Sequence, residues 1–244
     1  GGTILCDGTT GFYDSNHKRH FAPCLKSLGV SRIGKIADDI LSAYFEFPSK
    51  EGFTRFQNTD LVYLHGTYVY ADYEDGVTKY LRLIPPHRFA PAESAYHKNV
   101  TDYPAFTINE YGKGRGVYVP WSPCSEYYDF GFPNMDNFVS DLLDGILGYE
   151  PVETNAPAMV EITSTRKADG SAAYVHIVNG SGFFLNAYFK PNTLHDIYVA
   201  IPCARKPGSV KSMVTGSECK YEMKGDKLHI YLDEVGLFDA LKIV

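Results

Sequence analysis

The last hundred residues show the clearest pattern of apolar and polar positions. Short runs in which the two alternate recur there, separated by turns such as Asp169-Gly170 and Lys224-Gly225-Asp226. Alternation predicts half-buried β-strands, because successive side chains of a strand point to opposite faces. Strands at this spacing are typical of an antiparallel β-sandwich. The predicted strands span residues 159–164, 173–179, 196–201, 210–214, 227–232 and 239–244.

The first eighty-five residues combine short apolar runs with aromatic ones. A buried strand and a turn are predicted over residues 3–11, and a short helix over 21–28 that ends at Gly29. Aromatic-rich runs predict further strands. These strands span residues 42–47, 61–64, 67–70 and 78–83.

The pattern from residue 85 to residue 153 indicates where one domain ends. Residues 85–104 contain four prolines and predict an ordered surface loop, and residues 106–119 predict a hairpin around Gly112 and Gly114. Asn134 is expected to cap a helix whose apolar residues recur every three or four positions up to Leu147. Beyond Gly148 only strands are predicted, so we expect an α/β domain over 1–150 and a β-sandwich over 151–244.

The strand at Thr3 raises a question about the start of that α/β domain. A buried strand of a parallel sheet needs neighbours on both sides, and no earlier strand stands in the sequence. We therefore expect the chain to begin inside the domain.

Composition narrows the class of protein. With 44% hydrophobic and 21% charged residues among 244, the chain is typical of a globular protein with a substantial core. The formal charge of -6 gives no basic footprint for nucleic acid, and no apolar run is long enough to cross a bilayer. Five cysteines at wide spacing suggest free thiols, which favour a cytoplasmic location but leave export of the parent protein open.

Motifs for chemistry are not found in this sequence. It has no Gly-x-Ser-x-Gly elbow, and its acidic residues do not form the pair of carboxylates that a glycosidase needs. Asp14, His17 and His20 lie close together, but Lys18 and Arg19 between them favour a solvated loop over a metal site. No catalytic residue, metal or cofactor is expected in this chain.

One aromatic segment remains as a candidate site. Trp121, Glu126, Tyr127 and Tyr128 follow the predicted hairpin. Ligands of open α/β sheets bind beyond the carboxyl ends of strands, and aromatic faces stack on sugar rings. The other interpretation is that these rings pack the protein or a subunit contact, since Trp and Tyr are enriched at interfaces.

Several stretches taken in order resemble a known family. Residues 1–14, 21–30, 103–106, 110–120 and 127–133 are similar to the amidotransferase-like domain of family 42-type β-galactosidases and related glycoside hydrolases. The resemblance implies a (β/α)8 catalytic barrel first, then a flavodoxin-like trimerisation domain, then a small β domain. It also places the catalytic glutamates in the barrel. The first half of the flavodoxin-like domain has no counterpart here, and Pro120-Trp121-Ser122 stands where a working amidotransferase has His-x-Glu.

These observations lead to three hypotheses from different classes. The first is a non-catalytic accessory region of a glycoside hydrolase, which serves oligomer assembly and shapes the sugar site of the intact enzyme. Its partners would be an upstream barrel and further copies of the same chain. The second is a carbohydrate-binding module that uses Trp121, Tyr127 and Tyr128. The third is a free-standing hydrolase with an unrecognised site.

Overall fold

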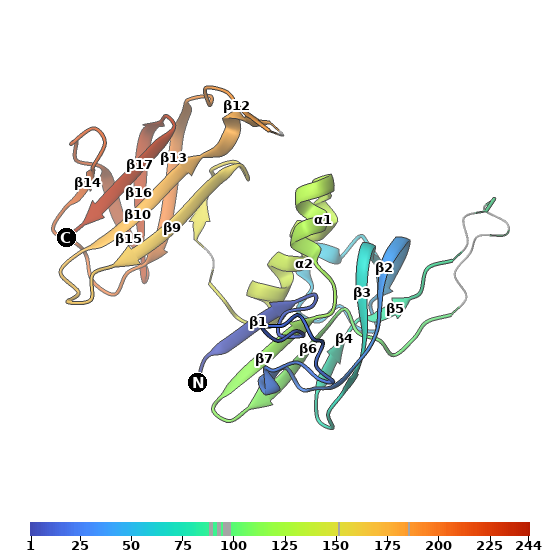
Figure 1. Ribbon diagram of the computed structural model, residues 1–244. Coiled ribbons are helices and arrows are strands. Elements are labelled where there is room, and N and C mark those ends of the chain that lie inside the picture. The colour runs from blue at the N-terminus through green and yellow to red at the C-terminus, as the bar shows by residue number, and fades with distance from the viewer. Residues whose placement is uncertain (88–89, 92–93, 95–98, 151, 185) are drawn as a thin grey trace. The chain divides into compact units, whose positions relative to one another are not determined.

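The chain divides into two compact units. A computed structural model describes residues 1–244 except 88–89, 92–93, 95–98, 151 and 185. Unit 1 comprises Gly1–Tyr149 and unit 2 comprises Glu150–Val244 (Figure 1). Most strand pairs in both units are antiparallel. Whether each unit folds as an independent domain stays a prediction.

The first sheet of unit 1 has four strands. Its order is β1 (Thr3–Asp7), β7 (Gly114–Val119), β6 (Phe106–Tyr111) and β4 (Thr78–Tyr80). The hairpin predicted over residues 106–119 is confirmed as β6 and β7. A flavodoxin-like sheet is mainly parallel, and β1–β7 is the one parallel pair among the strands that the structure describes.

The second sheet of unit 1 is built on a long hairpin. Its order is β3 (Leu61–Tyr73), β2 (Val30–Glu46) and β5 (Arg82–Ile84). The strand predicted over 42–47 is the end of β2, which has 17 residues. The two strands predicted over 61–64 and 67–70 are one strand, because Gly66 lets the backbone continue at a φ of 81°.

The single strand predicted over residues 78–83 is wrong. Leu81 adopts a φ of 56°, and at this residue the chain leaves one sheet for the other. β4 pairs with β6, whereas β5 pairs with β2. The aromatic-rich pattern predicted extended backbone correctly but carried no signal for the change of sheet.

The helix predicted over residues 21–28 is also wrong. Only Lys26–Leu28 form a 3-10 turn, closed by Gly29 at a φ of 66°. Upstream, Ile33 N donates a hydrogen bond to Phe21 O, and Cys24 N donates one to Gly11 O. These bonds go to distant residues of the chain, so helical i to i−4 bonds cannot form.

Two helices follow the hairpin, of which only the second was predicted. They are α1 (Pro123–Phe130) and α2 (Pro133–Ser140), and α2 continues as a π-helical segment (Asp141–Ile146). Gly148 ends this stretch at a φ of 69°, as expected. Asn134 is not the cap: its side chain accepts a hydrogen bond from Tyr63 N at 2.9 Å and so ties α2 to β3.

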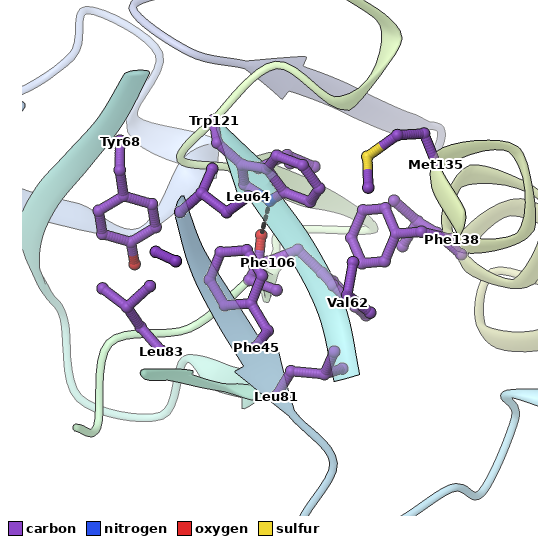
Figure 2. Packing of buried hydrophobic residues seen from close by; sticks show 14 of the residues in the cluster. Phe45, Val62, Leu64, Tyr68, Leu81, Leu83, Phe106, Trp121, Met135 and Phe138 are labelled. Atoms are coloured by element: carbon purple, nitrogen blue, oxygen red, sulfur yellow. Dashed lines mark hydrogen bonds between the residues drawn. The ribbon is translucent and has the colours of Figure 1, made fainter. Parts of the chain in front are cut away.

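The core of unit 1 is dominated by aromatic side chains. Figure 2 shows Phe45, Phe106, Trp121 and Phe138 packed together, with Met135 and Phe138 reaching in from α2. Both sheets contribute, since Phe45 lies on β2 and Phe106 on β6. A second 3-10 turn (Thr54–Phe56) adds Phe56 to the same core.

The surface loop predicted over residues 85–104 includes residues 88–89, 92–93 and 95–98, which the structure does not describe. The prediction that this loop is ordered therefore lies outside the described residues.

Unit 2 confirms the predicted β-sandwich. Its two antiparallel sheets share one core made of Val, Ile and Leu. Among the described residues of unit 2, five elements were not predicted: β8 (Glu153–Thr154), β11 (Phe183–Phe184), β12 (Ala187–Tyr188), β15 (Lys220–Lys224) and the 3-10 turn Gly180–Gly182. One sheet has the order β14 (Val210–Ser212), β17 (Phe238–Ile243), β10 (Ala173–Asn179) and β9 (Val160–Arg166). The other sheet has the order β15 (Lys220–Lys224), β16 (Lys227–Val235), β13 (Leu194–Pro202) and β8 (Glu153–Thr154). A small hairpin consists of β11 (Phe183–Phe184) and β12 (Ala187–Tyr188).

Candidate functional site

Helix α1 carries most of the residues that the sequence singled out. Pro123 occupies its first turn, where a missing N–H costs nothing, and Gly131 closes it in the left-handed conformation. The Gly131 amide donates to Tyr127 O at 2.7 Å. The helix packs against β3 and α2. Apart from Pro123 and Glu126, its residues are exposed, so it presents two turns of surface on unit 1.

Trp121 lies just before α1 and is completely buried. Its indole Nε1 donates to Ala105 O at 3.0 Å, drawn as a dashed line in Figure 2. Its ring centroid lies 5.2 Å from that of Phe45 and 5.1 Å from that of Phe138. With 0% of its surface exposed, the ring has no face open to a sugar. Of the two interpretations of the aromatic segment, interior packing describes Trp121.

Glu126 is the one residue of α1 whose carboxyl group is buried beneath the helix. Only 5% of its surface is exposed. Its Oε1 accepts a hydrogen bond from His65 N at 2.9 Å, while Oε2 has no partner among the described residues. Burial raises the pKa of Glu126 to about 7, against the opposing effect of the bond from His65 N. At neutral pH this carboxyl group therefore exists in both protonation states.

Four rings surround the contact between α1 and β3. Tyr63 and His65 lie on β3, and Phe130 and Phe132 lie at the end of α1 and just beyond it. We call these four residues the four-ring patch. Phe130 and Phe132 stack at 5.3 Å with 10° between their planes, and they meet the β3 rings edge-on at 5.0 and 5.8 Å.

The four-ring patch is partly open to solvent. Phe130 is 45% exposed and Phe132 is 40% exposed. Tyr63 is anchored by its hydroxyl, which donates to Leu41 O at 2.9 Å. Burial, together with the charge of Glu126, raises the Tyr63 pKa, so its phenol stays protonated at neutral pH.

Tyr127 and Tyr128 lie on α1 and are 40% and 75% exposed. Their phenols remain available as surface groups, as the expectation of a sugar or subunit contact requires. The structure thus brings Glu126 together with Tyr63 and His65, which sequence reasoning did not connect with α1. The alternation on β3, with Val62 and Leu64 buried and Tyr63 and His65 half-buried, was the signal that could have found them.

The described residues form no metal centre of three or more His, Cys, Asp or Glu side chains. Asp14 instead accepts hydrogen bonds from Asn16 N and Lys18 N, and so shapes the turn that carries His17. The five cysteines are all free thiols. Among the described residues, no helix is both long and apolar enough to span a membrane.

Comparisons with known proteins relate the fold to part of a sugar-processing enzyme. No family model and no curated protein matches the chain. Among solved structures, α-L-fucosidase isoenzyme 2 from Paenibacillus thiaminolyticus matches with a TM-score of 0.67 at 16% identity, over 99% of this chain and 36% of that chain. The chain thus shares the fold of about a third of a glycoside hydrolase.

A second solved structure is much less similar. A cycloisomaltooligosaccharide glucanotransferase from Paenibacillus sp. aligns over 85% of this chain and 40% of its own, with a TM-score of 0.28 at 12% identity. At that TM-score we base no argument on the second similarity.

Proposed function

We propose that this chain is a non-catalytic accessory region of a glycoside hydrolase. The observation that carries the proposal is the match of 99% of the chain, both units included, to 36% of an α-L-fucosidase chain. The match includes residues of both units, so it is not confined to a single common motif. Because fold alone does not specify activity, the residues of the site have to support the proposal as well.

The burial of Glu126 supports a non-catalytic role. Its pKa of about 7 would suit a general acid. Glycoside hydrolysis needs two carboxyl groups on either side of the scissile bond, at ~5 to 10 Å from one another. Glu126, however, is only 5% exposed and its bonded oxygen is occupied by a backbone amide. It is placed to hold α1 on β3, not to reach a sugar.

The four-ring patch supports a contact with another protein surface. Large half-exposed rings such as Phe130 and Phe132 are the residues that interfaces enrich, together with exposed tyrosines such as Tyr128. The partners we propose are an upstream (β/α)8 catalytic barrel of the same protein and further copies of it. We also propose a relation to the flavodoxin-like trimerisation domain of family 42-type enzymes, of whose parallel sheet the described strands contain one pair, β1–β7.

The test compares the protein encoded by the complete gene with this chain alone. Both are assayed with 4-nitrophenyl glycosides that include α-L-fucoside and β-D-galactoside. We expect turnover only by the complete protein. Turnover by the chain alone would support a free-standing hydrolase instead, and the lack of a barrel upstream would overturn the accessory role.

The role in assembly needs its own measurement. We expect the change Phe130→Ser with Phe132→Ser to lower the mass of the complete protein in light scattering after size-exclusion chromatography. The matched control is Tyr111→Ser, which removes a ring that is 51% exposed on the β6–β7 hairpin. An unchanged mass in the patch variant contradicts a subunit contact at the four-ring patch.

The second candidate function is carbohydrate binding by α1. It is favoured by Tyr127 and Tyr128, which are exposed on one short helix, whereas the third ring of the segment, Trp121, is buried. Calorimetric titration with fucose, galactose and their oligosaccharides tests it. Binding that is lost in Tyr128→Ala, while the fold is retained, would favour the module.

A further inference from the structure

Unit 1 contains a concave surface whose lining includes no residue of α1 or of the four-ring patch. It has a volume of about 560 Å³, within the range of small-molecule sites. Residues from the start of β2, the end of β3 and two loops line it, chiefly Arg19, Arg32, Lys35, Tyr70, Asp72 and Tyr103. Cations and tyrosines are thus gathered at one hollow of the surface.

A β-bulge in β2 determines which side chains face this hollow. Ile33 pairs with Ala71 and Ile36 with Val69, so Gly34 and Lys35 together oppose Tyr70. A Cβ at Gly34 would lie 2.4 Å from Tyr70 O, so only glycine fits there. Regular alternation would put Lys35 on the side of buried Ile33, whereas the bulge leaves it exposed like Arg32. Bulges of this kind redirect side chains next to functional sites.

The opposite side of the hollow is also held in place. Arg19 forms a β-bridge with Tyr13, across a turn shaped by the Asp14 carboxylate. The following segment is fixed to β2 by the bond from Ile33 N to Phe21 O at 2.8 Å. Arg19 is therefore presented by a structured turn.

The charges in the hollow do not cancel. Arg32 Nε bonds to Asp72 Oδ2 at 2.6 Å, so one cation is paired. Arg19 and Lys35 have no ion pair with any residue that the structure describes. This excess of two positive charges stands in a chain of net charge -6. Such a local reversal of sign attracts an anionic ligand.

The two tyrosines supply the other half of a ligand site. Tyr70 and Tyr103 are half-buried, and their rings meet edge to face at 4.9 Å. Burial, reinforced by Tyr103, raises the pKa of Tyr70, so its hydroxyl remains a neutral donor and acceptor. Two half-buried rings that carry hydroxyl groups suit a ligand that has both a C–H face and hydroxyl groups.

We propose that this hollow binds an acidic monosaccharide, whose carboxylate pairs with Arg19 and Lys35 and whose ring packs on Tyr70 and Tyr103. A guanidinium and an ammonium recognise a carboxylate through charge-assisted hydrogen bonds. The aromatic rings then discriminate a sugar acid from a bare anion. This site goes beyond the accessory role and does not depend on it.

The test is a calorimetric titration of this chain at low ionic strength with three probes: D-glucuronate, D-glucose and sulfate. We expect glucuronate to bind with a dissociation constant in the millimolar range, and more tightly than either glucose or sulfate. The variant Arg19→Gln with Lys35→Gln is expected to weaken glucuronate binding about tenfold or more, the loss of two charge-assisted contacts.

The matched control carries the same change of charge outside the hollow. Lys18→Gln with Lys113→Gln replaces two exposed cations that do not line it, and glucuronate binding should be retained. Equal loss in both double variants would show a non-specific charge effect and overturn the site. Equal affinity for sulfate and glucuronate, or no binding at all, would overturn recognition of the sugar acid. None of these results bears on the accessory role, which is tested on the complete protein.

Discussion

The cores of the two units are built from different residues. Unit 1 buries rings, among them Phe45, Phe53, Phe106 and Trp121, whereas the buried cluster of unit 2 consists of Val, Ile and Leu alone. Both units bury carboxyl groups, those of Glu126 and Asp141 in unit 1 and that of Asp239 in unit 2. Aliphatic side chains suit regular pleated sheets, while rings fill the irregular space between sheets and helices. The two cores are therefore filled in different ways, with aliphatic residues between two sheets in unit 2 and with rings between sheets and helices in unit 1.

The largest effect is expected from Trp121→Ala. The change removes a fully buried ring and its bond to Ala105 O, so the free energy of unfolding of unit 1 should fall by about 3–5 kcal/mol. Because the chain has one Trp, calorimetry rather than fluorescence has to measure the loss. Trp121→Phe, as the milder control, should cost less. If the units are separate, the unit 2 transition stays in place, and a shift of both would contradict that separation.

Arg55→Ala should destabilise unit 1 by about 3 kcal/mol, because it leaves the carboxylate of Asp141 buried without its cation. The guanidinium contacts Asp141 Oδ1 at 2.7 Å and Asp144 Oδ2 at 2.7 Å, and so fastens the 3-10 turn Thr54–Phe56 to the π-helical segment. Arg55→Lys keeps the positive charge but cannot contact both carboxylates as a guanidinium does, so it should recover part of the lost free energy of unfolding. Urea titrations measure both, and an equal loss in the two variants would assign the effect to geometry alone.

Ser212→Ala tests a buried polar pair of unit 2. Ser212 Oγ lies 2.9 Å from each oxygen of Asp239, which is 5% exposed. Removing the hydroxyl leaves that carboxylate short of a donor, which should cost about 1–3 kcal/mol. The control Ser217→Ala changes an exposed residue of the same segment and should stay within about 0.5 kcal/mol. If unit 1 responds instead of unit 2, the separation of the two cores fails.

The same contrast explains which parts of the fold the sequence could predict. In β10, Val175 and Ile177 are fully buried and the residue between them is half-buried, so simple alternation predicts the strand. In β2, the buried residues Ile33, Ala37 and Ile40 recur at intervals of four and three. The register shifts along the β2–β3 hairpin produce that spacing, which no strand template matches.

The candidate site was only partly predictable for a related reason. The sequence indicates Glu126 and its neighbouring rings as one segment, but the hydrogen-bond partner of Glu126, His65 N, lies 61 residues away. Likewise, Trp121 was a candidate because exposed and buried tryptophans look alike in a sequence. Contacts between distant segments decided both cases. The hollow at Lys35 has no sequence motif, because a β-bulge between Ile33 and Ile36 creates it.

The smallest effect is expected from Glu126→Gln, and it depends on pH. The folded pKa of Glu126 is about 7, raised by burial from an ordinary value of 4.5. Below pH 4.5 the folded and unfolded chains both hold the proton, and the stabilising contribution of the neutral group is complete. As the pH rises to 7, the unfolded chain releases the proton first, so unit 1 loses stability across this window.

Glutamine cannot ionise, so the unfolding free energy of the Glu126→Gln variant should not fall with pH across this window. At pH 8 it should exceed that of the unchanged protein by about 1–2 kcal/mol. Denaturant titrations at pH 4.5, 6 and 8 measure the slope, with Glu110→Gln on the exposed end of β6 as the control. Equal slopes for Glu126→Gln and the unchanged protein would mean that this carboxyl group reaches solvent, which would leave each unit with one buried carboxyl group, Asp141 in unit 1 and Asp239 in unit 2.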